Sequence, residues 1–273
     1  MRDTRYFEDQ VVIVTGASSG IGRSVALAFA AAGARVALVA RSSDALEAIA
    51  QQIQQRGQTS LVVPTDVTIR EEVAAMAAKV FERWGRIDIL VNNAGIGSHG
   101  PFWRTPYEDF ERIIRVNLVA VATCTSAVLP HMIRARSGKI VNVSSMIGKR
   151  AYPGNAAYCA SKFGLEGFAE SLRTEVRHQG IHVIQVCPDL TDTAFFDNLL
   201  QTDGHRKPAR AGMSPDAVAE MLLAATRRNQ RDLVIGMRAK ALVLLDKLVP
   251  GLLDRLLETR FLRQYPDAGP ARQ

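Results

Sequence analysis

The stretch Val11-Val-Ile-Val-Thr15-Gly16-Ala-Ser-Ser-Gly20-Ile-Gly22 decides the fold class of this chain. A β-branched run leads directly into three closely spaced glycines, and an alanine-rich helical pattern follows. Phosphates need close approach of backbone N–H groups, and they favour the positive N-terminal end of a helix. The stretch therefore predicts a dinucleotide phosphate loop, made by Gly16, Ser18, Ser19, Gly20, Ile21 and Gly22.

Two other interpretations of the same residues remain open. The segment also matches the G-x-S-x-G elbow of serine hydrolases, with Ser18 as the nucleophile. That enzyme needs a carboxylate and a histidine downstream, and the sequence favours none of its five histidines. The third interpretation is a glycine-rich turn that binds nothing.

Short β-branched runs alternate with longer amphipathic segments on both sides of this loop. We expect strands at 11–15, 35–40, 60–64, 87–92, 139–144, 181–187 and 232–235, with helices such as 22–32, 71–84 and 156–178 between them. This alternation predicts an α/β fold: a doubly wound parallel sheet (Rossmann fold) of about seven strands with helices on both faces. Residues 1–236 are expected to form this catalytic domain.

Composition excludes several other classes. The chain is 47% hydrophobic and 22% charged, as in ordinary globular proteins. Its net charge of +7 is dispersed, which fits a phosphorylated cofactor better than nucleic acid. The three cysteines have no metal-site or redox spacing, so we expect no metal and a reduced compartment. With no signal-peptide core and no apolar run as long as a membrane span, the expected location is cytoplasmic.

The end of the second strand bears on the choice of cofactor. It ends in Ala40-Arg41-Ser42-Ser43 without a carboxylate to bind a free ribose 2′-hydroxyl. Arg41 offers a charged fork that suits a 2′-phosphate, with the Ser42 hydroxyl beside it. The sequence therefore predicts NADP (NADPH), with NAD less favoured, while Ser43 is a candidate N-cap of the next helix.

Candidate catalytic residues follow later strands. Ser145 ends one strand, and Tyr158 and Lys162 follow it at the i, i+4 spacing that places two side chains on one helix face. We expect the ammonium and an oxidised nicotinamide to lower the pKa of the tyrosine toward the range that acid–base catalysis needs. Asn117 within a helical stretch predicts a specific hydrogen-bonding role.

The Tyr-x-x-x-Lys spacing alone often occurs by chance, but its position in the predicted fold supports a functional role. The glycine loop and five further segments each follow a different predicted strand: Arg41, Asp66, Asn93 to Gly95, Ser145 and Pro188. In a doubly wound sheet, ligands bind outside the carboxyl ends of the strands. These segments therefore converge on one edge of the predicted sheet.

As a set, these motifs resemble the short-chain dehydrogenase/reductase family over roughly residues 10–235. The resemblance implies that Tyr158 exchanges the proton, Ser145 holds the substrate oxygen, Lys162 binds the nicotinamide ribose, and Asn117 holds a water linked to Lys162. It also implies cofactor contacts by Asp66, Val67, Asn93, Ala94, Gly95, Pro188, Thr191 and Thr193. A homodimer or homotetramer is implied as well, with an interface on the helices around Asn117 and Tyr158.

One position departs from the family pattern, which has Pro-Gly where this chain has Pro188-Asp189. Aspartate tolerates positive φ better than most residues, so we expect the turn to survive. Asp189→Gly should then be folded and active. The irregular segment from Leu190 to Met213 is expected to cover the active site as a lid, or else to be a surface loop.

Residues 237–273 are expected to form a C-terminal Leu-rich extension. An amphipathic helix or helix pair is predicted over 239–263, interrupted at Pro250-Gly251, with a loose end from Tyr265. Packing on the domain or a partner subunit, lining an apolar pocket, and peripheral membrane contact remain open for it. Apolar side chains on the expected pocket walls suggest a bulky substrate such as a steroid, retinoid or acyl chain: Ile96, Phe102, Trp103, Met146, Ile147 and Tyr152.

The sequence thus favours an NADP-dependent oxidoreductase acting on a secondary alcohol, ketone or aldehyde. The alternative on the same fold is a non-catalytic NADP-binding sensor or scaffold. Such a protein usually lacks the catalytic tyrosine, lysine or serine, and all three are present here.

Overall fold

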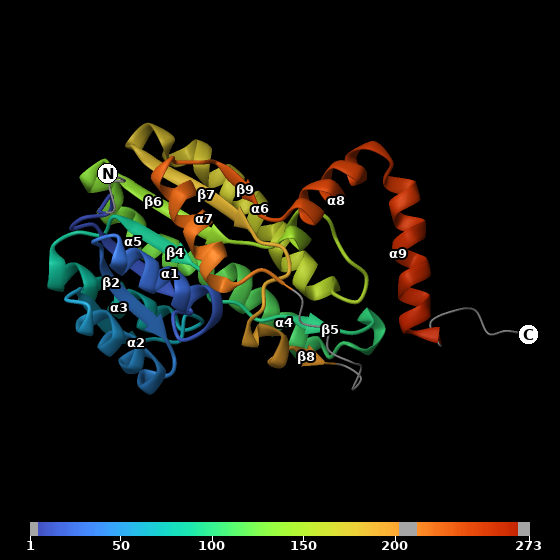
Figure 1. Cartoon of the computed structure of the whole chain (residues 1–273), viewed down its shortest axis with the longest axis horizontal. Helices are drawn as coiled ribbons and strands as arrows, with labels where there is room; N and C mark the ends of the chain where they lie inside the picture. The colour runs from blue at the N-terminus through green and yellow to red at the C-terminus, as the bar shows by residue number, and fades with distance from the viewer. Residues whose placement is uncertain (1–4, 202–211, 267–273) are drawn as a thin grey trace, which may run out of the picture.

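A single parallel sheet forms the centre of the molecule (Figure 1). The computed structural model describes residues 5–201 and 212–266. The strand order is β3-β2-β1-β4-β6-β7-β9, with β1 at Val11–Thr15 near the middle. The other strands are β2 (Arg35–Ala40), β3 (Ser60–Pro64), β4 (Ile89–Asn92), β6 (Gly138–Val143), β7 (Ile181–Cys187) and β9 (Asp232–Val234). The predicted seven-stranded, doubly wound sheet is confirmed.

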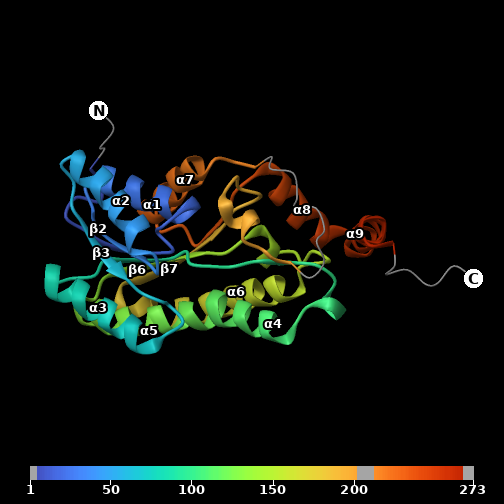
Figure 2. The same ribbon diagram turned by 90° about the horizontal axis from the view of Figure 1, so that it is seen from below.

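Helices cover both faces of this sheet (Figure 2). One layer contains α1 (Gly20–Ala31), α2 (Ser43–Gln55) and α7 (Pro215–Arg227). The other contains α3 (Arg70–Trp84), α4 (Tyr107–Ile114), α5 (Ala120–Ala135) and α6 (Ala156–Val176). A buried strand in such a sheet must be apolar on both sides, which explains the continuous run in β1. Val12 and Val14 pack into one core, and Val11 and Ile13 into the other.

Some element boundaries differ from the prediction for local reasons. The fourth strand begins at Ile89, since Asp88 accepts a hydrogen bond from the Val11 backbone N–H at 2.8 Å and pairs with Arg86. The helix expected to reach His178 ends at Val176 in a short 3-10 turn, Arg177–Gln179. Between α4 and α5 the chain forms a π-helical turn, Arg115–Val119, which contains Asn117.

The continuous helical stretch from Tyr107 to Ala135 bears on the expectation that no apolar run is as long as a membrane span. It contains an 18-residue window that is long and apolar enough to cross a membrane by length and composition alone. A core helix passes the same test, and this stretch packs against α3 and α6 within the domain. Length and composition alone therefore do not identify this stretch as a membrane span.

Two helices follow the last strand. They are α8 (Met237–Leu248) and α9 (Pro250–Gln264), so the predicted interruption falls at Val249 and Pro250 opens the second helix. Proline suits that place because the first helical N–H groups have no partner inside the helix. Both helices extend from one end of the domain (Figures 1 and 2). A small second sheet pairs β5 (Ser98–His99) with β8 (Leu200–Gln201).

Candidate active site

A large cleft lies at the carboxyl ends of the strands. Its volume is about 1380 Å³, and it runs from the glycine loop after β1 to Arg260 and Gln264 on α9. Pockets for one drug-sized ligand hold roughly 300–1,000 Å³, so this cleft has room for a dinucleotide and a substrate together. Most of the predicted site residues line it: Gly16, Ser18, Ser19, Gly20, Ile21, Arg41, Ser42, Asp66, Val67, Asn93, Ala94, Gly95, Ser145, Tyr158, Lys162, Pro188, Thr191 and Thr193.

Gly22 and Asn93 build the phosphate loop from behind. A Cβ on Gly22 would lie 2.1 Å from the Gly16 carbonyl oxygen, so only glycine allows this approach. Gly22 does not line the cleft. The Asn93 side-chain amide donates to the carbonyl oxygens of Thr15 at 3.0 Å and Gly16 at 3.2 Å. Asn93 therefore holds the loop in shape, a role that the sequence pattern did not reveal.

Arg41 and Asp66 lie together at the far side of the loop. Burial raises the pKa of Asp66, but hydrogen bonds from Thr68 and the charges of Arg41 and Arg112 outweigh it and lower the pKa overall. Arg41 is exposed and lines the cleft. Ser42, not Ser43, caps α2, and its hydroxyl accepts a long hydrogen bond from the Ala45 N–H at 3.5 Å. This edge of the cleft thus carries the exposed Arg41 guanidinium together with the Asp66 carboxylate.

Ser145, Tyr158 and Lys162 meet at the base of the cleft. Tyr158 and Lys162 share one face of α6, with the Lys162 ammonium 5.6 Å from the centre of the Tyr158 ring. A hydrogen bond joins Tyr158 to Ser145. The Lys162 ammonium is buried and donates to the Val143 carbonyl oxygen at 2.9 Å. An ammonium has three N–H donors, so this lysine has capacity for further acceptors in the cleft.

Burial changes the proton affinities of this group. It lowers the pKa of Lys162 to about 8, and the neighbouring Glu166 carboxylate opposes that shift in part. Burial raises the pKa of Tyr158, against the smaller lowering effect of the Ser145 hydrogen bond. The lowered tyrosine pKa was expected with an oxidised nicotinamide bound, so it stays a prediction. Tyr158 keeps its proton at neutral pH, as a proton donor must.

Asn117 lies behind the cleft rather than in its wall. It is fully buried in the π-helical turn, where its side chain accepts from the Ile96 N–H at 2.9 Å and donates to the Ile96 carbonyl oxygen at 2.8 Å. It also donates to the Ser161 hydroxyl at 3.0 Å. These bonds join the loop after β4 to the helix that carries Tyr158 and Lys162, which accounts for a polar residue at this helical position.

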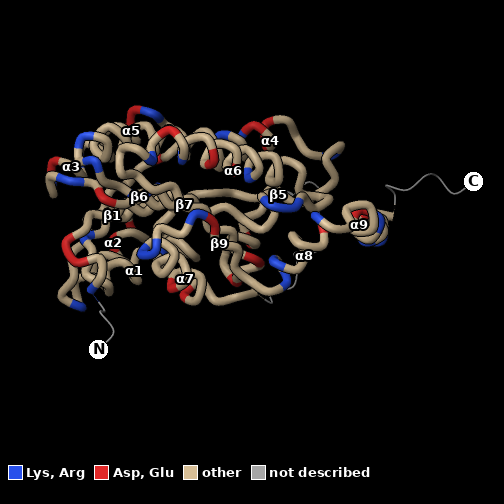
Figure 3. Tube along the Cα trace, turned by 90° about the horizontal axis from the view of Figure 1, so that it is seen from above, with Lys and Arg blue, Asp and Glu red and all other residues tan. Residues whose placement is uncertain are grey.

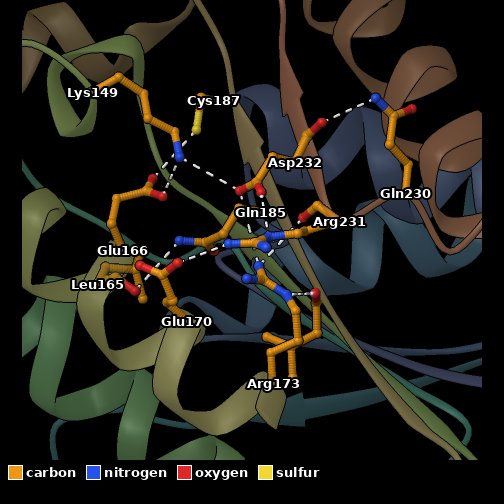
Figure 4. A network of polar contacts seen from close by, with 11 residues as sticks. Lys149, Leu165, Glu166, Glu170, Arg173, Gln185, Cys187, Gln230, Arg231 and Asp232 are labelled. Carbon is orange, nitrogen blue, oxygen red and sulfur yellow. Dashed lines mark hydrogen bonds and ion pairs between the residues drawn. The ribbon is translucent and has the colours of Figure 1, made fainter. Parts of the chain in front are cut away.

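A polar network that the sequence did not reveal surrounds Glu166, four residues after Lys162 in the chain (Figure 4). Glu166, one turn further along α6, accepts a hydrogen bond from Lys149 at 2.6 Å and another from the Cys187 thiol at 3.3 Å. Lys149 also lies 3.5 Å from Asp232 of β9. The network connects the catalytic helix with β7 and β9, the strands that precede the Pro188 loop and α8.

The segment from Pro188 to Thr193 lies beside the glycine loop, and Asp189 does not adopt the positive φ that was considered for it. Its φ is not among the positive values of the described residues. Instead, its carboxylate accepts from the Leu190 N–H at 2.8 Å, and a Cβ on Gly236 would lie 2.8 Å from the Asp189 Cβ. Thr193 lies over the glycine loop, 3.2 Å from the position of a Cβ on Gly20.

The substrate end of the cleft is largely apolar. Phe195 packs near Tyr158, with ring centres 5.7 Å apart. Four of the predicted wall residues line this end: Ile96, Met146, Ile147 and Tyr152. Three further residues that the sequence did not single out also line it: Phe196, Leu199 and Arg260. Phe102 and Trp103 do not line the cleft; both are largely exposed, and Trp103 packs on Phe261 of α9. Residues 202–211 of the expected lid lie outside the described residues.

This arrangement defines a class of protein: a nicotinamide-dinucleotide oxidoreductase of the Rossmann type. The sequence pattern of the short chain dehydrogenase family matches residues 10–204. The chain belongs to the short-chain dehydrogenase/reductase family. Because the match includes the glycine loop, it removes the hydrolase interpretation of Ser18.

Similar proteins agree with this assignment. Dehydrogenase/reductase SDR family member 7B of Bos taurus is 34% identical over 272 residues, covering 95% of this chain and 84% of the relative. A metagenomic short-chain oxidoreductase, solved in complex with NADP, is 33% identical with a TM-score of 0.71, covering 84% of this chain and 98% of that chain. A short chain dehydrogenase/reductase from Burkholderia phymatum, solved in complex with NAD, is 25% identical with a TM-score of 0.81, covering 91% and 96%.

Proposed function

We propose that this protein is an NADPH-dependent reductase of ketones or aldehydes that carry a bulky apolar group. The observation that carries the proposal is the meeting of Ser145, Tyr158 and Lys162 in a cleft that continues to Arg41. A bound nicotinamide supplies the hydride chemistry of this family. The chain's own residues supply the proton, the alignment and the exclusion of water.

In this mechanism, Tyr158 donates its hydroxyl proton to the carbonyl oxygen of the substrate. The Ser145 hydroxyl donates a hydrogen bond to the same oxygen and so stabilises the charge that develops there. Lys162 would hold the nicotinamide ribose, and its positive charge beside Tyr158 stabilises the phenolate left behind. Asn117 positions α6 through Ser161 and the loop at Ile96.

The preference for NADPH is supported by Arg41. Its guanidinium lies at the edge of the cleft, beside Asp66, where the end of β2 offers no carboxylate. We expect NADPH to bind at least about tenfold more tightly than NADH, a difference of about 1.4 kcal/mol. Fluorescence titration of the wild type and Arg41→Ala tests this, with Arg56→Ala at the end of α2 as the control.

Collapse of the preference in Arg41→Ala, with Arg56→Ala unchanged, is the expected result. Equal binding of the two cofactors by the wild type would refute the role of Arg41 while leaving the family assignment intact. Binding of neither cofactor would contradict the proposed function itself.

The apolar walls support the substrate class. Tyr152, Phe195 and Leu199 contribute large apolar surfaces to the end of the cleft beyond Tyr158. Each additional buried CH₂ group adds about 0.8 kcal/mol, so kcat/KM should rise along a series of ketones of increasing chain length. A preference for small polar sugars would contradict this part of the proposal.

We also propose a homodimer or homotetramer that forms through α4, α5 and α6. Val119 and Phe163 are exposed on this layer, 51% and 46% respectively. Light scattering on the purified protein tests the proposal, and a monomer at micromolar concentration would contradict it.

A further inference from the structure

The helices α8 and α9 present two different faces. On the inner face of α9, Leu253 and Leu257 are buried, and Phe261 packs against Trp103 with ring centres 6.0 Å apart. Gln264 lies 2.7 Å from His99 of the small sheet. These contacts fix α9 against the domain, and no other helix or strand within residues 5–201 and 212–266 covers its other face.

The outer face carries a band of exposed apolar side chains. Leu244 and Leu248 lie one turn apart on α8, and Leu252 and Leu256 lie one turn apart on α9. Each is more than half exposed, and Leu248 reaches 68%. Scattered single leucines on a surface are ordinary, but exposed leucines repeated one turn apart on two consecutive helices are typical of an interaction site. We call these four residues the leucine band.

The charges beside the leucine band have predominantly one sign. The carboxylates of Asp246 and Asp254 both pair with Arg150 of the domain, and its charge offsets part of theirs. Basic residues flank the band and are exposed, and Figure 3 marks basic positions on both helices. They are Arg238, Lys240, Lys247, Arg255 and Arg263, against the exposed carboxylates of Asp254 and Glu258.

This combination fits a lipid surface better than a second copy of the chain. A two-fold interface between copies would bring the same patch of each together, so that like charges would meet. Protein interfaces are also depleted in lysine. A helix with leucines on one face and flanking basic residues is typical of binding at the surface of an anionic bilayer.

The cleft opens beside the same helices. Arg260 and Gln264, on the inner side of α9, line its substrate end, and the Arg260 guanidinium lies 5.8 Å from the centre of the Tyr152 ring. We propose that the leucine band docks on an anionic lipid bilayer, which places the mouth of the cleft next to apolar molecules dissolved there. The second half of this inference rests on the proposed function; the docking does not.

The test is flotation of the full-length protein with two kinds of vesicle, without cofactor or substrate. One kind contains phosphatidylcholine alone, and the other an equal mixture of phosphatidylcholine and phosphatidylserine. We expect binding to the mixed vesicles at least about tenfold tighter, since each basic residue near an anionic surface contributes to the attraction. A loss of at least about tenfold is expected for Leu248→Asp with Leu252→Asp, and for Lys240→Gln with Lys247→Gln.

Met221→Asp, at a partly exposed apolar position of α7 outside the band, serves as the matched control and should bind like the wild type. Thermal unfolding verifies that each variant is folded. If the Leu248→Asp, Leu252→Asp variant is unstable, the Lys240→Gln, Lys247→Gln variant still tests the proposal. Absence of vesicle binding, or binding that neither pair weakens, would overturn the proposal. So would a shift of the oligomeric state by the aspartate pair in protein that binds no vesicles, which would assign the band to a second copy.

Because vesicle binding is read without any reaction, its failure is distinct from the failure of the proposed function. An active reductase that does not bind vesicles would refute the docking proposal alone. A vesicle-binding protein that oxidises no NADPH would refute the reductase alone.

Discussion

At the scale of single residues, Lys162 combines burial with a charge that the site needs. Burial lowers its pKa to about 8, below its ordinary value near 10.5. The ammonium is therefore lost as pH rises through about 8. A negatively charged cofactor favours the protonated form, so NADPH binding should raise this pKa and take up protons above that pH.

We expect the dissociation constant for NADPH to increase between about pH 8 and 9.5. A pKa that rises by about one unit on binding corresponds to about a tenfold change in affinity. Titration of Lys162→Met over the same range is the control, since it lacks the titrating group. An affinity of the wild type that stays flat to pH 9.5, or a dependence that Lys162→Met retains, would contradict this explanation.

The sequence identified most cleft residues because each follows a strand of a parallel sheet, and topology alone brings such positions together. It could not separate residues that face the cleft from those that support it. Gly22 and Asn117 share the motifs of cleft residues but lie behind its wall, whereas Asn93 lines the cleft and also supports the glycine loop through backbone carbonyl oxygens. The raised tyrosine pKa depends on burial, which spacing does not reveal.

At the scale of elements, the junction of β7, β9 and α8 depends on Asp189 and Gly236. The Asp189 N–H donates to the Ile235 carbonyl oxygen at 3.1 Å, and Gly236 adopts a φ of +103° against the Asp189 side chain. This φ is one that residues with a Cβ rarely adopt. The cofactor loop and the C-terminal helices therefore meet in one tight contact.

Asp189→Gly should remain folded and active, and lose about 1 kcal/mol of unfolding free energy with its hydrogen bond to Leu190. Gly236→Ala should cost more in the wild type than in the Asp189→Gly background, since the glycine removes the side chain that a new Cβ would meet. Urea unfolding of the four proteins measures the coupling. Strictly additive effects would refute the contact, and a folded but inactive Asp189→Gly would assign the carboxylate a positive role.

Helical periodicity predicted a helix pair at 239–263 but not what surrounds it. The pattern is the same whether leucines face a core, a partner or a lipid surface, and only the structure separates buried Leu253 and Leu257 from exposed Leu252 and Leu256. The wall assignment of Phe102 and Trp103 was wrong for a related reason. The place of Trp103 depends on contact with Phe261 of α9, more than 150 residues later in the chain, and Phe102 packs near Phe110 of α4.

At the scale of the whole molecule, the doubly wound sheet places the cofactor and substrate groups at one edge, and the C-terminal helices extend the same cleft. The first half of this arrangement follows from short-range patterns repeated along the chain. The second half depends on long-range contacts such as Arg150 with Asp246 and Gln264 with His99, which leave no local signature. Sequence therefore predicted the reaction class better than the surroundings of the substrate.

The central claim is that Tyr158 donates the proton in a reduction that uses NADPH. Single-turnover oxidation of bound NADPH by an apolar ketone, compared between the wild type and Tyr158→Phe, tests it most directly. We expect Tyr158→Phe to bind NADPH within about threefold of the wild type and to react about 10²–10⁴-fold more slowly, as loss of a general acid implies. A variant that reacts within tenfold of the wild type would contradict the account, as would a wild type that binds NADPH and reduces no carbonyl compound.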